Sequence, residues 1–274
     1  MTNRSKLAVW ISAPLILIGV STVSGIAGVK LGRQMLLNEM CCQVPARRNL
    51  VISVEELLRL KEFYSQTGQD KWVFEAIFPG VTDGFFLDVG SGDGTANSNT
   101  KSLEQKGWRG VCVDAFPRKM EGRTCQVFKE VVFSEAGKRV TFRVPGDLDL
   151  GGIVDTLGRW KETTGAARTE EFTTVTLGDI LERAKAPRFI HFVSLDIEGA
   201  ELEALRGFPF DRYKIGALDV EHNWEEPKRS QIFSLLKSHG YKRVPSWEQD
   251  DFYVSDVTGV PCTQESQIGF APPC

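Results

Sequence analysis

The chain has 274 residues, of which 42% are hydrophobic and 25% are charged, which is the ordinary composition of a globular protein. The formal net charge of -3 provides no basic excess for binding a phosphate backbone, so the composition argues against a nucleic-acid partner. Once an N-terminal apolar segment is set aside, the remaining length suits one α/β domain.

The first feature along the chain is an uncharged apolar run from Leu7 to Val29, with basic residues on both sides. It exceeds the ~20 residues that cross a bilayer as a helix, so we expect a single-pass transmembrane helix at 7–29 that tethers the protein to a membrane. A cleaved signal peptide, with small residues near Ala27, is the competing interpretation, and a buried core helix is a third. More basic residues follow the run than precede it, which favours the cytoplasmic side for the rest of the chain.

The predicted organisation follows from this run. We expect a short tail at 1–6, the membrane anchor at 7–29, a linker at 30–49, one catalytic domain at 50–258 and a C-terminal tail at 259–274.

The six cysteines do not define the redox environment. Cys41 and Cys42 follow the apolar run, where they would be palmitoylated in a cytoplasmic protein or would pair with the tail in an oxidising compartment. Cys112 and Cys125 fall in or beside predicted strands. Free thiols are the plain alternative for all of them, and no spacing matches a zinc site.

After the linker, two helices are expected, at 52–68 with Ser53 and Glu56 as a capping box, and at 70–78. Apolar runs then alternate with helix-length segments, and the last two short runs favour an antiparallel hairpin at the sheet edge. This pattern predicts a doubly wound, mainly parallel sheet covered by helices on both faces. The expected strands are at 84–90, 110–116, 125–133, 138–144, 189–197, 215–223, 241–244 and 250–254, the helices at 99–107, 200–207 and 229–240, with a strand running into a helix over 173–185.

Between these elements, residues 146–171 form a long stretch rich in Gly, Thr and charge. A loop of this length in a compact domain is a lid, a binding loop or a disordered segment. We expect the residues that select the substrate to lie in this loop and in the tail.

A glycine-rich turn follows the predicted strand "FFLDVG". Asp88 ends the apolar run, and Gly90, Gly92 and Gly94 follow at alternate positions. Glycine removes side chains so that backbone N–H groups can approach a ligand. About 20 residues further on, Asp114 ends the next strand, where a carboxylate can accept the hydroxyls of a ribose. The two features together predict a nucleoside site.

The spacing is GxGxG and not the GxGxxG of dinucleotide-binding proteins, so an NAD-dependent oxidoreductase is the weaker interpretation. Acidic residues at Asp88 and Asp93 would also repel a pyrophosphate. An acidic turn suits a ligand with a cationic centre, and S-adenosylmethionine carries a sulfonium, an ammonium and a ribose.

The chain resembles the FkbM-type family of S-adenosylmethionine-dependent methyltransferases. The segments "SQTGQDKWVFEAIFPG", "GFFLDVGSGDGTANSNTKSLEQKGWRGVCVDAFP", "VSLDIEGAELEALRGFPFD" and "LDVEHN" carry the resemblance, which covers 65–254. One departure is Ala115 after Asp114, where the family's pattern more often reads Glu-Pro. The resemblance implies a seven-stranded, Rossmann-like methyltransferase fold and O-methylation of a hydroxyl on a small molecule or glycan.

The resemblance also implies where S-adenosyl-L-methionine binds. Asp88, Gly90, Ser91 and Gly92 would line its methionine and ribose side, and Asp114 would bind the ribose. Gln69 and Asp70 would close over the cofactor, with a helix cap as their alternative role.

A hydroxyl acceptor needs a base near its proton, at the carboxyl ends of the strands. Asp196, at the end of "FVSLD", and His222, just after "LDVE", meet this condition, and Glu198 ranks after Asp196. An N-cap role is the alternative for Asp196. Glu201 and Glu203 are interpreted as helix electrostatics and solvation.

A metal site built from Asp196, Glu198, Glu221 and His222 is chemically possible, since carboxylates and imidazole suit magnesium or manganese. No spacing requires one, and we expect no metal. The rival function is a membrane-tethered adaptor on a methyltransferase scaffold that has lost catalysis.

Overall fold

A computed structural model describes residues 62–144, 150–158 and 168–256, together with four short strands nearer the N-terminus. The chain divides into two compact units, Met1–Glu62 and Phe63–Cys274, and each is described by itself.

In the first unit, β1 (Lys6–Ala8) pairs antiparallel with β4 (Val51–Ser53), and β2 (Trp10–Ser12) pairs antiparallel with β3 (Leu15–Leu17). These strands occupy part of the segment that we predicted to be a transmembrane helix. Within the described part of the chain, no helix is both long enough and apolar enough to cross a membrane. The predicted transmembrane helix is therefore corrected: the described residues of this run form short strands, because an apolar run rich in β-branched residues is also a strand pattern.

Strand β4 likewise occupies the start of the helix predicted at 52–68, so Ser53 lies in a strand. Residues 54–61 of that predicted helix, the predicted linker at 30–49 and the predicted C-terminal tail at 259–274 lie outside the described residues.

The second unit is built on a seven-stranded sheet with the order β14-β15-β13-β12-β5-β6-β7. Neighbouring strands from β13 to β7 are parallel, whereas β15 is antiparallel to both β13 and β14, which confirms the predicted edge hairpin. The strands are β5 (Phe85–Val89), β6 (Arg109–Asp114), β7 (Gln126–Lys129), β12 (Phe189–Leu195), β13 (Lys214–Glu221), β14 (Tyr241–Trp247) and β15 (Asp250–Ser255).

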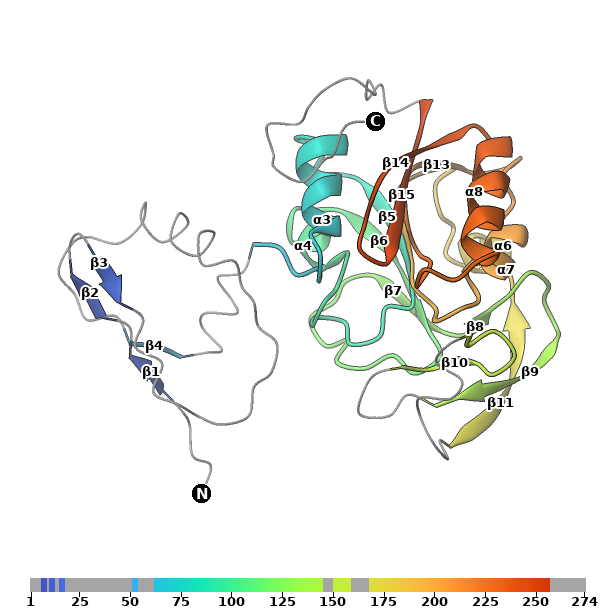
Figure 1. The fold of residues 1–274 in the computed structure, drawn as a ribbon, viewed down its shortest axis with the longest axis horizontal. Coiled ribbons are helices and arrows are strands. Elements are labelled where there is room, and N and C mark those ends of the chain that lie inside the picture. Colours follow the sequence, from blue (N-terminus) through green and yellow to red (C-terminus); the bar gives the residue numbers. More distant parts are fainter. Residues whose placement is uncertain are drawn as a thin grey trace. The chain divides into compact units, whose positions relative to one another are not determined.

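Helices cover both faces of this sheet (Figure 1), as the alternating pattern predicted. Strands β5, β12 and β13 are buried almost throughout, because apolar side chains pack on both of their faces. One face carries α3 (Gln69–Lys71), which continues as the π-helix η1 (Trp72–Ile77), and α4 (Lys101–Gln105); the other carries α6 (Leu177–Arg183), α7 (Glu201–Arg206) and α8 (Lys228–Ser238).

A smaller four-stranded sheet has the order β10-β9-β11-β8. It comprises β8 (Val131–Val132), β9 (Arg139–Arg143), β10 (Gly152–Ile153) and β11 (Thr169–Val175). Part of the segment predicted to be a long loop therefore forms a strand, because Gly152 and Ile153 pair with Arg143 and Phe142.

Candidate active site

Carboxylates line up on one face of the large sheet. Ser194 of β12 pairs with Asp88 of β5 on one side and with Asp219 of β13 on the other. Because alternate residues of a strand share a face, the next positions along these strands on the same face are Gly90 and Asp196, followed by Glu221. The carboxyl edge of the sheet is therefore acidic.

The antiparallel strand β15 extends this row. Asp250 pairs with Glu221 in the sheet register, although β15 runs in the opposite direction. Asp250 is buried, and its Oδ2 accepts a hydrogen bond from Gln69 Nε2 over 2.9 Å. Burial and the neighbouring Asp196 raise the pKa of Asp250 to about 7. No signal in the sequence marks this residue, since a strand start in an edge hairpin matches no motif.

The glycine turn is shaped by close backbone contacts. Gly90 and Gly92 have positive φ angles of 90° and 45°, which only glycine adopts easily. The N–H groups of Gly90 and Ser91 bind the carbonyl oxygen of Val113, and that of Gly92 binds the Asp114 carboxylate over 2.9 Å. These amides hold the turn to β6, so they do not face a ligand as we had predicted.

Asp88 is buried below the turn, and burial raises the pKa of its carboxyl group. Thr100 Oγ1 donates a hydrogen bond to Asp88 Oδ2 over 2.5 Å. Asn99 Nδ2 binds Ser194 Oγ and Asp219 Oδ2 over 2.9 and 3.2 Å. The "SNT" segment at 98–100 thus supplies hydrogen-bond donors to Asp88 and Asp219, a role that the sequence did not indicate.

Asp196, directly after β12, lies within hydrogen-bonding distance of Glu221. Asp196, Glu198 and Glu221 each bring a carboxylate oxygen to a common region, and these oxygens lie within 4.8 Å of one another. Although the Asp196 side chain is accessible to solvent, the surrounding protein and the nearby acids raise its pKa to about 6. Burial and the same acidic neighbours raise the pKa of Glu221 further. Glu221 is therefore the neutral partner that donates to Asp196.

The turn after Asp196 is held by Glu201. Its Oε1 accepts hydrogen bonds from the N–H groups of Ile197 and Gly199 over 3.1 and 2.9 Å, and its Oε2 lies 3.1 Å from Lys228 Nζ. The Glu201 side chain is fully buried. Helix electrostatics alone, as predicted, does not describe this residue, because its carboxylate fixes the backbone that carries Asp196 and Glu198.

Gln69 and Asp70 have different surroundings. Gln69 is buried and reaches Asp250. The carboxylate of Asp70 accepts hydrogen bonds from Ser65 Oγ, the Tyr64 N–H and Ser102 Oγ. Asp70 therefore anchors the segment before α3 to α4 and does not face the cavity.

His222 is buried, but it does not face the acidic row. Its Nδ1 accepts a hydrogen bond from the Trp224 N–H, and its Nε2 lies 3.6 Å from Asp251 Oδ1. Successive residues point to opposite faces, so His222 points away from the side that Glu221 occupies. Burial lowers the pKa of His222 to about 4, which leaves the ring neutral at pH 7.

A cavity of about 550 Å³ opens at this edge of the sheet. This volume is within the range of small-molecule sites. Eight of the predicted site residues line the cavity, whereas Asp70 and His222 do not. The lining includes Gln69, Asp88, Gly90, Ser91, Gly92, Asp114, Asp196 and Glu198, together with Glu221, Asp250, Trp224 and, from the β10 segment, Leu150, Gly151 and Ile153.

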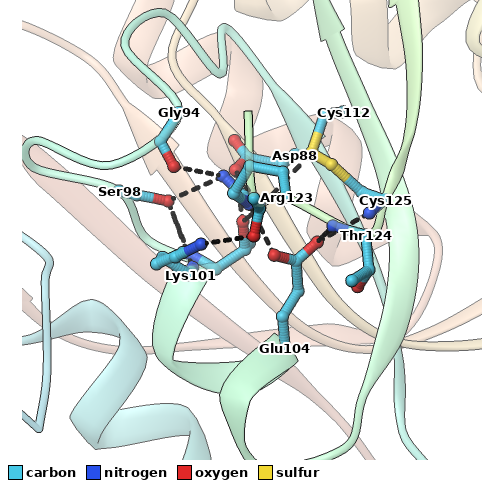
Figure 2. The surroundings of a disulfide bond; sticks show 11 residues. Asp88, Gly94, Ser98, Lys101, Glu104, Cys112, Arg123, Thr124 and Cys125 are labelled. Carbon is cyan, nitrogen blue, oxygen red and sulfur yellow. Dashed lines mark hydrogen bonds and ion pairs between the residues drawn. A yellow bond between two sulfur atoms is a disulfide. The ribbon is translucent and has the colours of Figure 1, made fainter. Parts of the chain in front are cut away.

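A disulfide joins Cys112 to Cys125, a pairing that the sequence did not indicate (Figure 2). It closes the connection between β6 and β7, next to Asp88. No motif marks this pair in the sequence, because Cys112 lies within β6 and Cys125 directly precedes β7, with 13 residues of separation.

The parallel sheet with a glycine turn after its first strand and an acid after the next is the architecture of nucleoside-binding α/β enzymes. Residues 88–243 match the family model described as "Methyltransferase FkbM domain", which is more than half of the chain. The chain belongs to this family, as its resemblance implied. A search of the curated proteins found no match.

Proposed function

We propose that this chain transfers the methyl group of S-adenosyl-L-methionine to a hydroxyl group on a small molecule or glycan. The observation that carries the proposal is the meeting of two residue sets at one cavity: Asp88 and Asp114 for a nucleoside cofactor, and Asp196 for a base. Membership of a methyltransferase family supports the reaction class.

The cavity fits the chemistry of this cofactor. S-adenosylmethionine is a cation that carries a ribose, and the wall beside the glycine turn is acidic and free of side chains at Gly90 and Gly92. Ser91 Oγ is buried, and no described residue forms a hydrogen bond with it, so it is available to a polar group of a ligand. In this proposal Asp88 and Ser91 hold the amino-acid end, and Asp114 accepts from the ribose.

When bound, the cofactor supplies an electrophilic methyl group. The chain contributes position and a proton acceptor. Holding the acceptor oxygen in line with the methyl group contributes most of the rate gain, since effective molarities of ~10⁵–10⁸ M are reached in well-oriented reactions.

Asp196 takes the proton of the acceptor hydroxyl. A base works best when its pKa lies near the working pH, and the pKa of Asp196 is raised to about 6. Glu221, held by Asn223 Nδ2 over 2.6 Å, keeps the Asp196 carboxylate oriented toward the cavity.

Calorimetry tests the cofactor, and isotope transfer tests the reaction. The chain should bind S-adenosylmethionine, and Asp88→Asn should weaken that binding by tenfold or more. Incubation with methyl-labelled cofactor and a metabolite and glycan extract should give products heavier by one methyl group. Absence of binding at millimolar concentration would refute the proposal, whereas binding with no product from any extract would favour a non-catalytic binding protein.

A further inference from the structure

The side chain of Arg123 is completely buried beside the predicted cofactor site, in a connection that carries no motif. Its Nε lies 2.6 Å from Glu104 Oε2, and its Nη2 lies 4.0 Å from Asp88 Oδ2. An ionised guanidinium cannot be neutralised by losing its proton, so its charge must act on the groups around it. Arg123 is thus the nearest cation to Asp88 among the described residues.

Several contacts fix the position of Arg123 (Figure 2). Its Nη1 donates to the Gly94 carbonyl oxygen and to Ser98 Oγ over 2.9 and 3.2 Å. Glu104 also accepts from the backbone N–H of Cys125 over 2.7 Å. The Cys112–Cys125 disulfide ties this segment to β6, and Arg123 Nη2 lies 3.3 Å from Cys112 Sγ.

Thr100 connects Arg123 to Asp88. Arg123 Nη2 donates to Thr100 Oγ1 over 2.7 Å, and the same hydroxyl donates to Asp88 Oδ2. A hydroxyl has one proton and two lone pairs, so accepting from a cation strengthens its donation to a carboxylate. The orientation and the charge of Asp88 are therefore both set through Arg123.

We propose that Arg123 is a positioning residue for the cofactor, which orients the Asp88 carboxylate through Thr100 and favours its charged form, so that it binds the cationic amino-acid end. This inference rests on the proposed function, because it assumes that Asp88 contacts S-adenosylmethionine.

Arg123 and Glu104 act on Asp88 with opposite sign. The Arg123 charge lowers the pKa of Asp88 against the effect of burial, whereas the Glu104 charge raises it. The other charged groups that face Asp88 are Asp114 on β6, Asp196 after β12 and Asp219 on β13. These three acids are unchanged in variants of Arg123 and Glu104, so a comparison with the wild type isolates the effect of Arg123 and Glu104 on Asp88.

The test measures the affinity of the full chain for S-adenosylmethionine by calorimetry from pH 5 to 9. In Arg123→Gln, the pH at which binding reaches half of its high-pH strength should rise by about one unit or more, because a carboxylate loses its neighbouring cation. In Glu104→Gln, the same midpoint should fall. Arg123→Lys keeps the charge and should keep the midpoint near that of the wild type.

Equal weakening by Arg123→Gln and Glu104→Gln with an unchanged midpoint would show a purely structural role and overturn the inference. If Arg123→Gln does not fold, as judged by thermal unfolding, the test uses Thr100→Val and Glu104→Gln. Thr100→Val should raise the pH midpoint of binding, and Glu104→Gln should lower it. An unchanged midpoint in both variants would overturn the inference. Failure of the wild type to bind at any pH would instead refute the proposed function.

Discussion

Gly90 and Asp196 lie so close that a Cβ atom built on Gly90 would fall 1.6 Å from the carbonyl oxygen of Asp196. This contact joins the glycine turn after β5 to the acid that follows β12, and the Asp196 N–H binds the Val89 carbonyl oxygen over 2.9 Å. The glycine at this position is therefore required by the neighbouring strand as well as by its own positive φ angle.

Replacement of Gly90 by alanine should lower the free energy of unfolding by several kcal/mol. The Asp196 backbone must move away from the new Cβ atom, and the alanine must also adopt a strained positive φ angle. Gly137 is the matched control, since its φ is 82° and nothing lies within 4 Å of a Cβ built there. Gly137→Ala should cost only the strain, about 1–2 kcal/mol. Chemical denaturation of both variants measures the difference, and equal losses would mean that the contact with Asp196 is not limiting.

Replacement of each of two glutamates on α7 by alanine should have sharply different effects on the free energy of unfolding. Glu201→Ala removes a buried carboxylate from two backbone N–H groups and Lys228, and should lower the free energy of unfolding by about 3 kcal/mol. Glu203 pairs with Arg206 at the surface, and Glu203→Ala should change stability by less than about 1 kcal/mol. Similar urea midpoints for the two variants would contradict the role assigned to Glu201.

Asp196→Asn should lower the rate of methyl transfer by about 10²–10⁴-fold and change the affinity for the cofactor by only a few-fold, because Asn cannot accept a proton. Glu203→Gln is the control and should keep the wild-type rate and the wild-type affinity for the cofactor. In the wild type, activity should fall as pH drops through about 6, where Asp196 becomes protonated. If Asp196→Asn lost cofactor affinity by the same factor as it lost rate, the role of Asp196 would be cofactor binding and not proton removal from the acceptor.

The buried acids also predict how stability depends on pH. The pKa of Asp250 is raised from 3.8 to about 7, so the folded state binds more protons than the unfolded state between these values. The stabilising contribution is complete below pH 3.8 and is lost as pH rises through about 7. Without ligand, the melting temperature of the wild type should fall between pH 5 and 8, and Asp250→Asn should make this fall smaller. The asparagine side chain still offers an oxygen acceptor to Gln69 Nε2. An unchanged slope would show that Asp250 does not titrate in this range.

The sheet and most of the cavity were predictable because strand patterns and the glycine turn are local in the sequence. The positions of Asp88, Asp114 and Asp196 follow from one rule, that the carboxyl ends of parallel strands meet at one edge. The described residues of the apolar N-terminal run form strands where a helix was predicted, because an apolar run does not by its periodicity separate a strand from a helix.

The contributions of Asp250, Arg123 and Glu201 depend on contacts between distant parts of the chain. Gln69 and Asp250 meet across a sequence separation of 181 residues, and no local pattern predicts such a pair. His222 was assigned by its position after a strand, and one residue of register places it on the opposite face from Glu221.

The acidic row has a consequence for turnover. Methyl transfer removes the sulfonium charge, so the spent cofactor, S-adenosylhomocysteine, is less cationic than the molecule that entered. A cavity wall that carries Asp88 and the Asp196 carboxylate attracts the sulfonium form more strongly than the product, in which the sulfur is uncharged and the ammonium remains. The acidic wall would thus hold the product of the proposed reaction less tightly than the cofactor that enters, by the loss of the sulfonium charge alone.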